Sequence, residues 1–134
     1  MRVSGSVRVV AVTLLLLAHA SCSKPPEPVK ITAIDLGSAV DAENRVLSPA
    51  MTYSPQSTVY ASIATEGMGT ATLTARWTDP DGQLLADQTQ AINPTKPAYF
   101  EFHLAPPGGW GKGRHKVVFA IGGTGSRTRE FEIR

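Results

Sequence analysis

The stretch TATLTARWT, residues 70–78, decides the fold. Every second residue in it is apolar, and threonine or arginine stands between; the apolar positions are Ala71, Leu73, Ala75 and Trp77. Such alternation is typical of a β-strand with one buried face and one solvated face, which threonine suits because it is β-branched. We therefore expect a strand here, with its apolar face against a core.

A turn and a returning strand follow directly. Residues 79–82, DPDG, place proline second and glycine fourth, which is typical of a type I turn. Residues 84–92 can then run back antiparallel to the first strand. Their alternation is poorer, so we expect them to form a sheet edge.

Further strands are expected on both sides of this hairpin. The patterns predict them at 29–36, 58–65, 99–104, 115–121 and around 131–133. The first of these has apolar residues on both faces. Residues 37–57 have no clear period and form a long connection, with room for a short strand near Met51 to Tyr53. About seven strands and no helical period predict an all-β chain folded as an antiparallel β-sandwich.

Two features resemble the immunoglobulin-like and fibronectin type III-like sandwiches. Trp77 lies where such domains place a buried tryptophan on the third strand, and residues 113–117, GRHKV, resemble the G-x-Y-x-V start of their sixth strand. His115 stands in place of the family's tyrosine. The family's inter-sheet cysteines are absent, and their places are taken by Ile63 or Ala61 and by Val117. The resemblance spans residues 29–134 and implies an immunoglobulin-like sandwich without a disulfide.

The first 21 residues have the pattern of a secretory signal peptide. Arg2 and Arg8 give a basic start, and residues 9–18 are apolar except for Thr13. This run is too short to span a bilayer, which needs about 20 apolar residues. No later stretch of the sequence is long and apolar enough for a membrane helix.

Two cleavage sites are open. Residues 18–20, AHA, form an A-x-A site that would release a secreted chain starting at Ser21. Residues 20–22, ASC, resemble the end of a bacterial lipobox, in which Cys22 is lipidated and becomes the first residue. His19 departs from that pattern, which prefers leucine.

Three observations favour lipidation. Cys22 is the only cysteine, and an unpaired exported thiol without a role would be a liability. Residues 23–28, SKPPEP, suit an extended polar tether. By resemblance to enterobacterial lipoproteins, Ser23 suggests the outer membrane. We expect a signal peptide at 1–21, lipidated Cys22 with its tether at 22–28 and the sandwich at 29–134. The protein would be lipid-anchored at the outer membrane or in the periplasm, with free secretion as the alternative.

The charge balance argues against nucleic acid as a partner. Once Arg2 and Arg8 are removed, 11 of the 13 lysines and arginines remain, equal to the 11 aspartates and glutamates. A chain without net charge lacks the basic surface that nucleic acids require. Six of the basic groups that remain gather near the C-terminus: Lys112, Arg114, Lys116, Arg127, Arg129 and Arg134. They could meet anionic lipid headgroups or an acidic partner, or they could be solvated faces and edge protection.

The most suggestive loop is APPGGWGKGRHK, residues 105–116. An exposed Trp110 beside Lys112 and Arg114 could stack on a sugar ring or anchor a protein partner. Alternatively, Trp110 covers the open end of the sandwich and the glycines supply the turns. This loop is the candidate binding site.

No recognisable catalytic, metal or cofactor motif accompanies it. His103 and His115 are the only histidines after the leader, and their spacing is not that of metal ligands. There is no G-x-S-x-G elbow. Asp79 and Asp81 belong to a turn whose carboxylates usually accept backbone hydrogen bonds. Residues 122–125, GGTG, lack the lysine and helix of a phosphate-binding loop.

The expected function is therefore binding rather than catalysis. The sequence and the resemblance to small immunoglobulin-like lipoproteins of Gram-negative envelopes predict a non-enzymatic module that binds an envelope protein or glycan, without a cofactor, through loops or an edge strand. The alternative is an inhibitor or accessory subunit of an exported enzyme, with one loop blocking a cleft.

Overall fold

The computed structural model describes residues 5, 25–123 and 125–134, and Cys22 and nearly all of the expected leader lie outside them. The described chain is all-β and has no helix. Its eight strands are β1 (Lys30–Gly37), β2 (Thr52–Tyr53), β3 (Val59–Glu66), β4 (Ala71–Thr78), β5 (Leu84–Ile92), β6 (Ala98–Leu104), β7 (Gly113–Ile121) and β8 (Ser126–Ile133).

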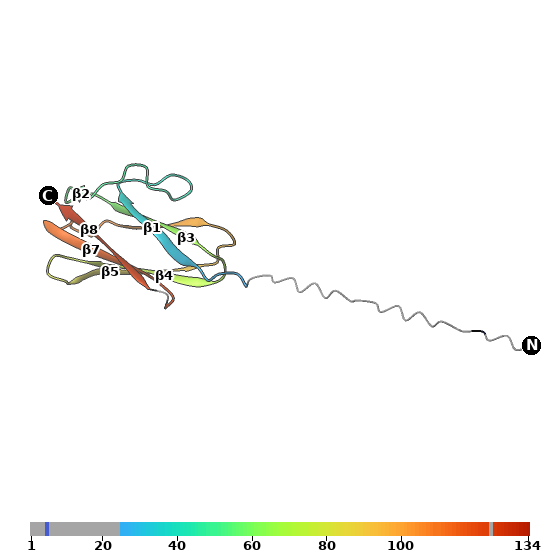
Figure 1. Ribbon diagram of the computed structural model, residues 1–134. Helices are drawn as coiled ribbons and strands as arrows, with labels where there is room; N and C mark the ends of the chain where they lie inside the picture. The colour runs from blue at the N-terminus through green and yellow to red at the C-terminus, as the bar shows by residue number, and fades with distance from the viewer. Residues whose placement is uncertain (1–4, 6–24, 124) are drawn as a thin grey trace, which may run out of the picture.

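The strands form two sheets, as a sandwich requires (Figure 1). One has the order β1-β3-β6 and the other β2-β8-β7-β4-β5. The grouping of β4, β7 and β8 matches strands C, F and G of the immunoglobulin arrangement, and β1, β3 and β6 match A, B and E. The predicted β-sandwich is confirmed.

One pair of strands in this otherwise antiparallel sandwich is parallel. β2, the short strand expected near Met51 to Tyr53, runs parallel to β8, with Thr52 opposite Glu132. All other strand pairs are antiparallel. The chain leaves β1 in the first sheet and returns beside the last strand of the other, and a crossover of this kind permits parallel pairing.

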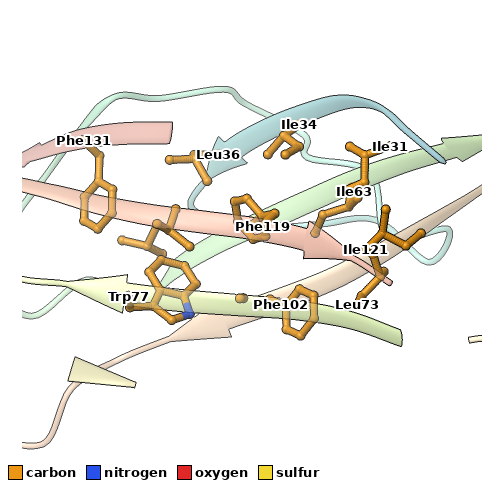
Figure 2. Close-up of a cluster of buried hydrophobic side chains, with 14 of the residues drawn as sticks. Ile31, Ile34, Leu36, Ile63, Leu73, Trp77, Phe102, Phe119, Ile121 and Phe131 are labelled. Atoms are coloured by element: carbon orange, nitrogen blue, oxygen red, sulfur yellow. The ribbon is translucent and has the colours of Figure 1, made fainter. Parts of the chain in front are cut away.

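The core lies between the sheets. Leu73, Ala75 and Trp77 of β4 are fully buried, which confirms the face predicted for residues 70–78. Figure 2 shows side chains from both sheets meeting there, among them Ile63 from β3 and Phe119 from β7. With no disulfide in the described chain, this packing joins the sheets.

A β-bulge explains the apolar residues on both faces of the first strand. The register of β1 against β3 shifts between Ile31 and Ala33. An extra residue reverses which side chains face inward. Ile31 is therefore buried before the bulge, and Ile34 and Leu36 are buried after it.

The connection after β1 is organised around one carboxylate. Asp41 accepts hydrogen bonds from the backbone N–H groups of Glu43 and Arg45, both at 2.9 Å, and pairs with the Arg45 guanidinium at 3.1 Å. These contacts, led by the Arg45 backbone, hold the pKa of Asp41 below its usual 3.8. An isolated β-bridge between Val40 and Val46 closes this loop. A segment without periodicity thus has a defined shape.

Candidate functional site

The candidate loop lies at one end of the sandwich, which we call the far end. The ends of β4 and β6 and the starts of β5 and β7 meet there, so the β4–β5 turn and the 105–112 loop are neighbours (Figure 1). A cleft of about 360 Å³ opens between them. Its lining is Asp79, Pro80, Asp81, Leu85, Pro106, Gly109, Trp110, Gly111, Lys112 and His115.

Trp110 holds the loop in place. Its backbone N–H donates to Pro55 O at 2.7 Å, and its indole Nε1 donates to Ser57 O at 2.8 Å. Gly109, at φ 85°, leaves no room for a side chain because a Cβ would lie 2.9 Å from Pro55 O. The loop is therefore fastened to the turn that precedes β3.

Of the two arrangements considered for Trp110, the structure shows the buried one. The residue is 4% exposed and packs among aromatic rings, with centroids 6.1 Å from Trp77, 5.2 Å from Phe131 and 5.2 Å from His115. Burying so large a ring in the core outweighs leaving it free for a ligand. The alternative, in which Trp110 covers the open end of the sandwich, describes the structure.

Lys112 and Arg114, the two cations predicted for this loop, point to different surfaces. Lys112 is exposed and lines the far-end cleft. Arg114 is the second residue of β7 and pairs with Glu130 of β8 at 3.2 Å, on the solvated face of the sheet. The three predicted site residues therefore do not form one surface, and Lys112 is the one at the cleft.

The Asp79 carboxylate and the His115 ring beside the cleft make structural contacts. Asp79 Oδ1 accepts from the N–H groups of Asp81 (2.9 Å) and Gln83 (2.8 Å), as expected of this turn. His115 is 1% exposed and stacks on Phe131. Its Nδ1 lies 3.1 Å from Gly113 O, and because a carbonyl only accepts, Nδ1 is the donor.

Two arginines of the basic C-terminal cluster protect a sheet edge. Arg127 donates to Thr32 O (3.1 Å) and Arg129 donates to Ile34 O (3.2 Å), both on the outer side of β1. Ala50 N–H satisfies Leu36 O, the next outward carbonyl. These contacts favour edge protection over a lipid-binding patch for Arg127 and Arg129.

The other two cations of the cluster form ion pairs on the solvated face of the sheet: Lys116 pairs with Glu130, and Arg134 pairs with Glu132.

Sequence reasoning missed Gln88 on β5. Its Oε1 accepts from Trp77 Nε1 at 2.9 Å, and its Nε2 donates to His103 O on β6 at 2.8 Å. One side chain thus satisfies the buried indole and links the two sheets on their second open side. No local pattern could predict this contact, because it depends on which strands face each other across the sandwich.

Neither a metal centre nor a membrane helix occurs in the part of the chain that the structure describes. Within residues 25–123 and 125–134, no three or more His, Cys, Asp or Glu side chains gather as metal ligands. The same residues contain no helix of the length and hydropathy needed to cross a bilayer.

No protein-family model and no curated protein matches the chain. Solved structures do. A beta-glucosidase from Listeria innocua in complex with isofagomine aligns with a TM-score of 0.51 and 12% identity, and the same enzyme with gluconolactone aligns with 0.50 and 11%. Each alignment covers 81% of this chain and 16% of the enzyme. What they share is a β-sandwich fold. The chain spans about one sixth of those enzymes, so their activity is not transferred to it.

Proposed function

We propose that the protein is a non-enzymatic, exported lipoprotein that is anchored through Cys22 and presents the far end of its sandwich to an envelope protein or glycan. The observation that carries this proposal is that the tether and the candidate loop lie at opposite ends of the domain.

Residues 25–28 of the tether join the sandwich at the end opposite the β4–β5 turn, which lines the cleft (Figure 1). Glu27 O accepts from Met68 N–H at 3.1 Å, and Pro28 packs so close to Gly67 that a Cβ there would lie 2.4 Å from Pro28 O. From this end β4 runs eight residues to the far end, which at about 3.3 Å per residue is a distance of about 25 Å. A chain anchored before Pro25 would therefore hold its far end away from the membrane.

The loop is suited to binding because it is already ordered. Its backbone is fastened through Trp110, so a partner would not have to order it, and less conformational entropy is lost on association. Two of the titratable groups beside it, Asp79 and His115, are engaged in structural contacts, and Asp81 is the exposed carboxylate of the cleft. Both points support binding rather than chemistry.

The test compares two lysines at opposite ends. The protein carrying Lys112→Glu, and a control carrying Lys96→Glu near the tether end, serve as baits in detergent-solubilised envelopes of the host. We expect Lys112→Glu to change capture of a specific partner about tenfold, because it reverses the one lysine charge in the cleft lining, and Lys96→Glu to leave capture unchanged, because Lys96 lies outside the cleft. Equal capture by both variants would contradict a far-end site.

The second candidate is an inhibitor or accessory subunit of an exported enzyme. It is favoured by the same fastened loop, since a rigid loop can occupy an enzyme cleft at low entropic cost. If the captured partner is an enzyme whose turnover changes when the purified protein is added, and Lys112→Glu removes the change, this second function is the correct one.

A further inference from the structure

The outer edge of β5 is the longest strand edge that no other strand of the described chain pairs with. On β1, the outward carbonyls accept from Arg127, Arg129 and Ala50. On β6, two carbonyls accept from the side chains of Asn44 and Gln88. β2 is only two residues long, whereas β5 has nine residues. No strand within residues 25–123 and 125–134 pairs with the outer side of β5. An open edge is a template for another extended chain.

The outward backbone groups of β5 follow from the pairing of β4. Gly122 N–H donates to Thr72 O, so the backbone of Thr72 faces β7. Since backbone groups alternate sides along a strand, Leu73 faces β5, where it is opposite Gln90. Even-numbered residues of β5 therefore bond to β4. The residues that offer N–H and C=O groups outward are Asp87, Thr89 and Ala91.

A β-bulge exposes two leucines where this edge begins. Trp77 and Thr78 are opposite Ala86 and Leu84, which leaves Leu85 as the extra residue. Leu84 is 53% exposed and Leu85 is 40% exposed. Bulges often redirect side chains beside functional sites. Here the bulge brings Leu85 into the lining of the far-end cleft, so the open edge and the cleft are continuous.

The cleft is more acidic than basic. Asp79 and Asp81 line it together with the single lysine, Lys112. The Asp81 carboxylate is exposed and has no ion pair among the described residues, whereas Asp87 on the edge is paired with Arg76 at 3.5 Å. The unpaired charge in the cleft fits a cation supplied by the partner.

We propose that the β5 edge and the far-end cleft together bind one extended segment of a partner protein. Its backbone pairs with residues 87–91, an apolar side chain packs on Leu84 and Leu85, and an adjacent lysine or arginine pairs with Asp81. Main-chain hydrogen bonds supply affinity in this mode, and the pockets supply specificity. The inference rests on the proposed binding function and names its partner class.

A second copy of the chain fits this edge less well. Two β5 strands paired antiparallel would be related by a two-fold axis, and their tether ends would point in opposite directions. Two chains anchored in one membrane cannot both hold their tether ends towards it in that arrangement. A peptide segment carries no such constraint.

The test uses the full chain, purified in detergent, and a nine-residue synthetic peptide of alternating valine and threonine that ends in Leu-Lys. We expect the peptide to slow amide hydrogen exchange in 84–92. Thr89→Pro should weaken binding about tenfold, because it removes an outward N–H and leaves the β4 ladder intact. Thr89→Val, which keeps the N–H, should bind as the native protein does.

Several outcomes would overturn the proposal. They are no binding by the native protein, equal binding by Thr89→Pro, undiminished binding of a peptide N-methylated along its pairing edge, or protection of another strand. A dimer in sedimentation that Thr89→Pro dissociates would assign the edge to a second copy instead. The peptide test uses no envelope component, so it is independent of the capture test with Lys112→Glu. If the peptide fails to bind, the proposed binding function is not contradicted. If the capture test fails, the peptide result is not contradicted.

Discussion

At the scale of single residues, burial decides which side chains are free to act. The glycines around Trp110 are compatible with two arrangements, one with the indole exposed at a loop tip and one with the indole covering the end of the sandwich. The local sequence does not distinguish between these two arrangements. The structure does, because the indole N–H finds Ser57 O, 53 residues earlier in the chain. Partners so remote in sequence carry no local signal, whereas the exposure of Lys112 and Arg114 was predictable from charge alone.

Trp110→Ala should destabilise the fold rather than only remove a contact with a partner. It leaves a cavity among Trp77, Phe131 and His115, and large-to-small changes of this kind cost about 3–5 kcal/mol. Chemical denaturation measures the loss. Lys112→Ala is the control and should lie within about 0.5 kcal/mol of the native protein. An alanine variant with native stability that had lost its partner would show that Trp110 belongs to the binding surface.

Tyr53 should make stability depend on alkaline pH. Burial raises its pKa to about 12 from the usual 10.0, and its hydroxyl donates to Ala50 O at 2.7 Å. The folded state therefore keeps a proton that the unfolded chain releases. The contribution is complete below pH 10 and is lost as pH rises towards 12. Denaturation across this window should show a steeper decline for the native protein than for Tyr53→Phe, and parallel curves would contradict the burial of the hydroxyl.

At the scale of elements, local patterns predicted strands well and pairing less well. The β4–β5 hairpin was predictable because its first strand, its turn residues and its second strand follow one another directly in the sequence. The bulge at Ile31 was visible only as a mixed pattern, since its place depends on β3. The parallel pairing of β2 with β8 joins segments far apart in the chain, and periodicity carries no information about such partners.

Asp41 should control the order of the β1–β2 connection. Asp41→Ala removes the acceptor of two backbone N–H groups and the partner of the Arg45 side chain. We expect trypsin to cleave after Arg45 several-fold faster, because proteases act on locally opened chain. Glu43→Ala, which removes a carboxylate 3.8 Å from the same guanidinium, is the control. Equal cleavage of both variants would contradict this role.

The lowered pKa of Asp41 means that the turn keeps its contacts above pH 3.8 and loses them as pH falls below it.

At the scale of the whole molecule, the sandwich is closed on both open sides by polar side chains instead of a disulfide. Arg127 and Arg129 join β8 to β1, and Gln88 joins β5 to β6. The fold class was predictable because most of the long strands show the same alternation of apolar and polar residues. The cleft was not, because it arises from a bulge and from the meeting of two loops. The lipid anchor and the binding role remain predictions from the sequence.

The most direct test of this account is mass spectrometry of the native N-terminus, because anchoring at one end is what leaves the other end free for a partner. We predict a chain that begins at Cys22 and carries acyl groups, and a Cys22→Ser variant that lacks them and leaves the membrane fraction. An unmodified chain that begins at Ser21 would contradict the account.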